Sequence, residues 1–165
     1  MKKIYQAQHN EHVTRRPFEE VVRAFERAVG SVEGAYDEIV AKSRDAAEFE
    51  RLVREREGSS GFMRFFTADH GAWAALEGMH FRARMYTIGN PLIAMTMLKH
   101  EVAAGLNAPV RILIYEDAGG GTTRFAYDLP SSLMSVLGNE QVMNAARKLD
   151  EKLIALAVEV TGSEA

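Results

Sequence analysis

The spacing of apolar residues along the chain changes between two periods, and these periods mark its helices and strands. From residue 14 to residue 30 apolar side chains recur every three or four positions, at Phe18, Val21, Val22, Phe25 and Val29. This spacing predicts an amphipathic helix. Thr14 is its expected cap, Pro17 lies near its first turn, and Gly30 is expected to end it in a left-handed conformation. Before it, the polar stretch 4–13 predicts an edge strand.

Two shorter helices are expected between residues 31 and 58. The first would bury Tyr36, Ile39 and Val40. The second is capped by Asp45 and turns Phe49, Leu52 and Val53 inward. The many Glu and Arg residues from 48 to 57 indicate a solvated helix face with pairs four residues apart. A helix that binds a partner is the alternative.

After a loop at 58–61 the period becomes that of strands. The residues at 62–67 are apolar and aromatic, which predicts a buried strand, and further strands are expected at 82–88, 110–115 and 122–127. A glycine turn at 118–121 joins the last two. Helices are expected at 72–77, at 91–100 with Leu92, Met95 and Leu98 inward, and at 139–160. The fold class is therefore α+β: a mostly antiparallel sheet of about four or five strands with helices packed on one face, a two-layer sandwich.

The composition of the chain excludes several classes of function but does not identify one. The chain has 165 residues, which predicts a single domain over 1–165. Its net charge of -3 gives no cationic excess for phosphate backbones, so nucleic-acid binding is not expected. It has no cysteine, which excludes disulfides and thiolate chemistry. No apolar run reaches the roughly 18 residues of a membrane span, and no signal-like segment follows the N-terminus. A cytoplasmic location is therefore expected.

Several motifs in one order resemble those of a known family. They are the aromatic strand ending Asp69-His70, the step Ile88-Gly89-Asn90-Pro91, the strand from Pro109 to Asp117, and Tyr127 with Pro130. In this respect the chain resembles the bacterial and archaeal family of the domain of unknown function 302 (DUF302). The resemblance covers a core at 62–160, with 31–58 as a helical insertion. It implies a compact α/β sandwich that often forms a homodimer, and it transfers no catalytic residue.

Asn90 and Pro91 form a strand-to-helix junction with two interpretations. Asparagine at the cap and proline in the first turn make a well-formed helix start. The remaining N–H groups at that end would also attract a carboxylate or phosphate. Because Gly89 stands alone, with no glycine-rich loop around it, a nucleotide site is not expected.

The candidate catalytic residues are His70 and Glu116. His70 follows Asp69 at a strand end and suits a general base or a ligand. A histidine that only bonds to backbone is the alternative. Glu116 would form a carboxylate–histidine pair with His70, or it would be solvated or pair with Arg111 or Arg124. Strand order decides between these, and the sequence does not supply it.

Tyrosines on strands are the candidates for a flat ligand pocket, since each has a large apolar ring and a hydroxyl group that seeks a partner. Tyr115 and Tyr127 are the candidate ligand-binding tyrosines, and Asn90 and Asp69 are the other candidate ligand-binding residues. Core packing is the other interpretation of both. The five histidines lack the spacing of a metal site, so neither a metal nor a cofactor is expected. Ser131 is expected to cap a short helix.

Three hypotheses of function follow. The first is a domain that binds a small anionic or aromatic ligand in a pocket near Asn90, His70, Tyr115 and Tyr127. The second is an enzyme with His70 as general base, acting on a small carbonyl or acidic substrate. The third is a structural or assembly protein that acts through residues 31–58. A small-molecule ligand and a second copy of the chain are the expected partners.

Overall fold

The computed structural model describes residues 1–117 and 119–163. It contains one six-stranded open sheet in the order β1-β6-β5-β4-β3-β2. The strands are β1 (His9–Thr14), β2 (Gly30–Ser31), β3 (Met63–Asp69), β4 (Ala83–Gly89), β5 (Val110–Glu116) and β6 (Thr123–Asp128). All neighbouring pairs are antiparallel except β2 with β3. The predicted α+β class is confirmed, and β1 and the two-residue β2 bring the sheet to six strands.

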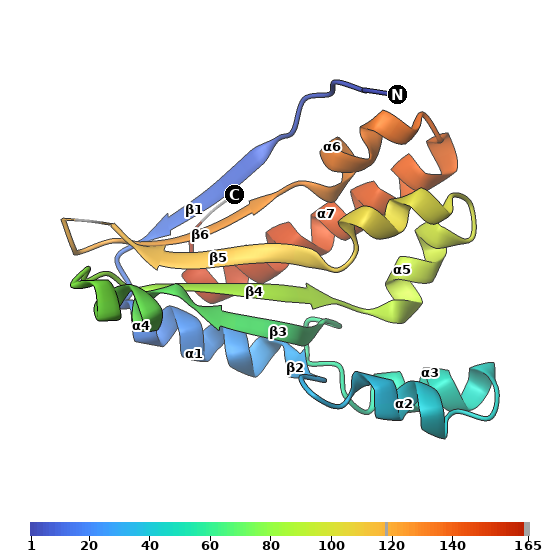
Figure 1. The fold of residues 1–165 in the computed structure, drawn as a ribbon, viewed down its shortest axis with the longest axis horizontal. Coiled ribbons are helices and arrows are strands. Elements are labelled where there is room, and N and C mark those ends of the chain that lie inside the picture. Colours follow the sequence, from blue (N-terminus) through green and yellow to red (C-terminus); the bar gives the residue numbers. More distant parts are fainter. Residues whose placement is uncertain (118, 164–165) are drawn as a thin grey trace.

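The helices lie on one face of the sheet and around its ends (Figure 1). They are α1 (Phe18–Ala28), α2 (Tyr36–Lys42), α3 (Ala46–Arg54), α4 (His70–Ala74), α5 (Pro91–Leu98), α6 (Pro130–Met134) and α7 (Glu140–Thr161). Three short 3₁₀ helices follow α4, α5 and α6, at Ala75–Glu77, Val102–Asn107 and Ser135–Leu137. The long helices α1 and α7 cover the same face, whereas α2 and α3 extend beyond the β2 edge (Figure 1).

The core lies between the sheet and the α1–α7 layer. The predicted stripe of α1 is buried there, and so are the apolar positions of α7 that recur every three or four residues: Val142, Ala146, Leu149, Leu153, Leu156 and Val160. Alternate residues of the central strands, such as Tyr86, Ile112 and Phe125, meet them from the sheet. A smaller cluster around Val53 and Met63 joins α2 and α3 to the end of the sheet.

Several local expectations are wrong, because strand pairing and helix packing decide these positions. Thr14 ends β1 instead of capping α1, whose cap residue is Pro17. The predicted strand at 62–67 is not buried along its length, since Phe66 is 53% exposed. In α5, Met97 is buried, whereas Met95, predicted to face inward, is exposed. The reason is that α5 packs against α7, so a different side of the helix from the predicted one is buried.

Ser131 is not a cap either, because it lies inside α6. Its backbone N–H donates to the Oδ1 atom of Asp150 on α7, at 3.0 Å. The start of α6 is therefore satisfied by a carboxylate from another helix. Of the predicted turn at 118–121, Ala118 lies outside the described residues, while the Gly120 N–H donates to the Asp117 carbonyl at 2.8 Å.

Candidate functional site

The antiparallel topology places the predicted site residues at two opposite ends of the sheet. Asp69 pairs with Arg84, and Ala83 pairs with Tyr115, so Asp69, His70, Tyr115 and Glu116 lie at one end. Asn90 follows the last residue of β4 and lies at the other end, toward which β6 also runs. Figure 1 shows α4 and α5 at these two ends. The structure therefore does not gather these residues into one pocket.

His70 begins α4 and forms a local contact. Its Nδ1 atom accepts a hydrogen bond from Trp73 Nε1 at 3.2 Å. Asp69 caps the same helix, accepting from the Ala72 N–H at 2.9 Å and pairing with Arg84 at 3.2 Å. Burial alone would raise the pKa of Asp69, but these hydrogen bonds outweigh it, and the pKa is lowered. Both residues thus organise the turn from β3 into α4.

Glu116 pairs with Arg82, with 3.8 Å between the Oε2 and Nε atoms, and not with Arg111 or Arg124. Among the described residues, no hydrogen bond or ion pair joins His70 to Glu116. The pairing on which the predicted carboxylate–histidine mechanism depends is therefore absent from this part of the chain.

Tyr115 and Tyr127 project to opposite faces of the sheet. The Tyr115 hydroxyl donates to Glu11 Oε1 at 2.6 Å on the face without helices, and this bond raises the pKa of Tyr115. Tyr127 is buried under the helices, where its hydroxyl lies 3.3 Å from His12 Nε2. Burial raises the pKa of Tyr127. Tyr86 shares the face of Tyr127, but both rings belong to the core, so they line no open pocket.

Asn90 caps α5 as predicted, and it also ties a loop to that helix. Its Oδ1 atom accepts from the Leu92 N–H at 2.9 Å. Its Nδ2 group donates to Glu57 Oε2 at 2.6 Å and to the Gly61 carbonyl at 3.0 Å. The side chain is buried with both of its polar atoms engaged. Asn90 therefore shapes the wall of a site without having a group left for a ligand.

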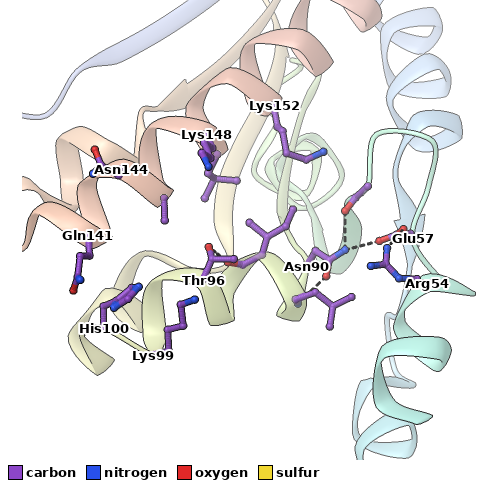
Figure 2. Close-up of a pocket in the computed structure, with 15 residues that line it drawn as sticks. Arg54, Glu57, Asn90, Thr96, Lys99, His100, Gln141, Asn144, Lys148 and Lys152 are labelled. Carbon is purple, nitrogen blue, oxygen red and sulfur yellow. Dashed lines mark hydrogen bonds and ion pairs between the residues drawn. The ribbon is translucent and has the colours of Figure 1, made fainter. Parts of the chain in front are cut away.

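A groove of about 700 Å³ lies beside Asn90, between α5 and α7. Figure 2 shows its walls, with Thr96 on α5 and Lys99 and His100 directly after that helix, opposite Asn144, Lys148 and Lys152 on α7. Its floor is apolar, formed in part by Ile93 and Leu149, while Arg54 and Glu57 stand at one end.

The groove is cationic. Within residues 1–117 and 119–163, Lys99, Lys148 and Lys152 make no ion pair with a carboxylate. The one acidic residue in the lining, Glu57, is already engaged by Asn90 and lies 3.6 Å from Arg54 Nη1. Lys152 Nζ lies 5.7 Å from the centre of the Phe62 ring. In the described part of the chain, the three ammonium groups therefore have no carboxylate at ion-pair distance.

Sequence reasoning missed these lysines, although part of the signal was present. Lys148 and Lys152 are four residues apart and flank the buried stripe of α7 at Leu149 and Leu153, so they lie on one side of that helix. Nothing in the sequence brings Lys99 next to them, because β5, β6 and α6 lie between α5 and α7 along the chain. Only the packing of α5 on α7 forms the groove.

A second hollow of about 580 Å³ lies on the other side of α5, toward α3. Its lining is largely carbon and includes Phe49, Phe65, Met95, Leu98 and Pro109. It shares Asn90, Leu92, Ile93 and Leu149 with the cationic groove. The two hollows therefore adjoin at the first turns of α5.

Neither a metal site nor a membrane span is present in the described part of the chain. No three histidine or acidic side chains gather there in a way that would hold a metal ion. No described helix has the length and apolar character that crossing a bilayer requires.

Comparison with known proteins supports the family resemblance. The model of the family "Domain of unknown function DUF302" matches residues 38–160. The match begins inside the segment 31–58, whose status as an insertion stays a prediction. The fold is similar to the crystal structure of an uncharacterised conserved DUF302 protein from Bacillus stearothermophilus. That likeness has a TM-score of 0.65 and 16% identity, and covers 92% of this chain and 97% of the other. No curated protein gives a significant match.

Proposed function

The chain belongs to the DUF302 family, whose function is unknown, and we propose that this member binds a small anion in the groove between α5 and α7. The ligand would carry a carboxylate or a phosphate group. The observation that carries the proposal is the set of three lysines, Lys99 at the end of α5 and Lys148 and Lys152 on α7, which line one groove without an ion-pair partner in the described chain.

Electrostatics supports an anion over a neutral ligand. Like charges that share a concave surface with apolar walls repel one another more strongly than they would in bulk water. An anion between them relieves this repulsion and gains charge-assisted hydrogen bonds. The side-chain amides of Gln141 and Asn144 line the same groove and would orient the ligand. Because the site is open to solvent, salt should weaken the binding.

The proposal is tested by calorimetric titration with inorganic phosphate, acetate and citrate at low ionic strength. We expect millimolar or tighter binding of at least one of these anions. In the double variant Lys148→Gln/Lys152→Gln, affinity should fall by about 100-fold, since two charge-assisted bonds are lost and each costs about 1.5 kcal/mol. Added salt should weaken the wild-type binding.

The control is Lys42→Gln, which removes a lysine on α2 that pairs with Glu38 and does not line the groove. It should bind like the wild-type protein. The proposal fails if none of the three anions binds, or if the double variant binds them as well as Lys42→Gln does.

The other hypotheses stay predictions. No contact in the described residues favours His70 as a general base, and no observation gives residues 31–58 a macromolecular partner. The homodimer that the resemblance implies also stays a prediction. The sheet face that carries Val13 and Phe66, 43% and 53% exposed, is the surface on which to test it. Light scattering on the purified protein would measure the oligomeric state.

A further inference from the structure

The second hollow, between α3 and α5, has an apolar lining and therefore suits a hydrocarbon group rather than the anion of the cationic groove. Phe49 of α3 and Phe65 of β3 form part of one wall, and Met95 and Leu98 of α5 form part of the other. Removing apolar surface of this kind from water lowers the free energy, so an apolar ligand would bind here favourably. A volume of about 580 Å³ is within the range of small-molecule sites.

One face of α3 borders both hollows. Ala46, Phe49 and Glu50 line the apolar hollow, and Arg54 and Glu57 line the cationic groove. Apart from the adjacent Phe49 and Glu50, these positions follow one another by three or four residues, so they form a single stripe along the helix and the turn after it. On the opposite side, Leu92 and Ile93 of α5 contribute to both hollows. The apolar and cationic parts are therefore two halves of one surface between α3, α5 and α7.

The acidic residues on this surface are neutralised locally. Glu50 Oε1 lies 2.7 Å from Arg54 Nη2, and Glu57 lies 3.6 Å from Arg54 Nη1 and accepts from Asn90. The lysines across the groove have no such partners in the described residues. A negative charge on a ligand is therefore attracted to the α7 side, away from the apolar end.

We propose that the ligand is an amphipathic anion, a single carboxylate or phosphate group attached to a hydrocarbon body. This rests on the proposed function, because the head group is the anion of the lysine groove. The head lies among Lys99, Lys148 and Lys152, and the hydrocarbon body lies across the first turns of α5 into the hollow lined by Phe49, Met95 and Leu98. Binding then combines charge with apolar burial, and neither half of the surface is used alone.

The test is a chain-length series of octanoate, decanoate and dodecanoate, each titrated calorimetrically below its micelle concentration, with dodecyl phosphate and dodecanol as the head-group arms. The dissociation constant should fall by about tenfold for each two methylene groups added. Dodecyl phosphate should bind at least as well as dodecanoate, and dodecanol about 100-fold more weakly.

Variants separate the two halves of the surface. Met95→Glu places a charge in the apolar hollow at a side chain that is 58% exposed, so the fold should survive. It should abolish the dependence on chain length while phosphate or acetate still binds. Val102→Glu, at a position 80% exposed outside both hollows, is the matched control and should behave as wild type. Circular dichroism confirms that each variant is folded.

The outcomes distinguish this inference from the proposed function. Small-anion binding that depends on the lysines but gains nothing from a longer chain overturns the amphipathic ligand and leaves the anion groove standing. Long-chain anions that bind Lys148→Gln/Lys152→Gln as tightly as they bind the wild-type protein overturn both the charged head and the anion groove. No binding by any anion, short or long, also overturns both.

Discussion

At the scale of single residues, Gly30 and Gly58 lie where the segment that leaves α1 and the segment that follows α3 pass in contact. Gly30 does not take the left-handed conformation expected for a helix end. Instead, a Cβ atom at Gly30 would lie 1.8 Å from the Arg56 carbonyl oxygen, and one at Gly58 would lie 2.3 Å from the Ala28 carbonyl oxygen. Both positions need glycine because two backbones pass in contact, which is the point from which α2 and α3 extend.

Gly30→Ala should therefore destabilise the protein by forcing these backbones apart, at a cost of about 1–3 kcal/mol in the free energy of unfolding. Urea denaturation followed by circular dichroism measures the change. Gly119→Ala is the control, since a Cβ atom there meets nothing within 4 Å, and it should have little effect. Equal stability of the two variants would contradict the close approach.

At the scale of elements, helix ends are satisfied both by local residues and by distant ones. Asp45 and Asn90 cap α3 and α5 as their sequence positions predict. The start of α6 instead depends on Asp150, whose buried carboxylate comes from α7. Burial raises the pKa of Asp150, so this cap is held at the cost of desolvating a charge. Local caps are visible in a sequence, and the cap from α7 is not.

Asn139 is the local cap whose loss should matter most, because α7 forms much of the core. Its Oδ1 atom accepts from the N–H groups of Gln141 and Val142, at 3.0 and 3.1 Å. Asn139→Ala should lower the free energy of unfolding by about 1 kcal/mol. Asn139→Asp keeps the acceptor and adds a favourable charge at the helix start, so it should be close to wild type. Urea denaturation compares the two, and an alanine variant as stable as the aspartate one would refute the cap.

At the scale of the whole molecule, the sheet and the helix layer enclose a histidine that links folding to pH. His12 on the edge strand β1 is buried, with Nε2 near the Tyr127 hydroxyl and Nδ1 3.3 Å from Ser163 Oγ. Burial lowers its pKa below the ordinary 6.5, so the unfolded chain binds a proton more readily than the folded one. His12 therefore stabilises the fold above pH 6.5, and this contribution is lost as the pH falls through the folded pKa.

We expect the wild-type protein to lose stability between about pH 7.5 and pH 5.5, and His12→Gln to lose less over the same interval. The hydrogen bond that His9 donates to the Asp128 carboxylate raises the pKa of His9, which acts in the opposite direction and reduces the wild-type loss. Urea denaturation at both pH values gives the comparison, with His80→Gln, at an exposed position, as the control. If His12→Gln and wild type lose equal stability, His12 is not the group responsible.

Across these scales, the features predictable from sequence are those that a helix or strand forms with its own neighbours. The stripes of α1 and α7 and the caps Asn90 and Asp45 depend on residues within a few positions of each other. The location of polar strand ends is not predictable in this way. Asp69, Tyr115 and Asn90 all follow or end apolar strands, but the antiparallel pairing sends them to different ends of the sheet.

The amino-acid sequence by itself determined the α+β class, the main helices and strands, and the family, because periodicity and capping act over one or two turns of chain. The tertiary structure alone decided the candidate site. It separated His70 from Asn90 and placed Lys99 opposite Lys148 and Lys152. It also used the side-chain amide of Asn90 in hydrogen bonds to Glu57 and Gly61. The physical reason is that a site between α5 and α7 depends on how two distant helices pack, and packing is a property of the whole core.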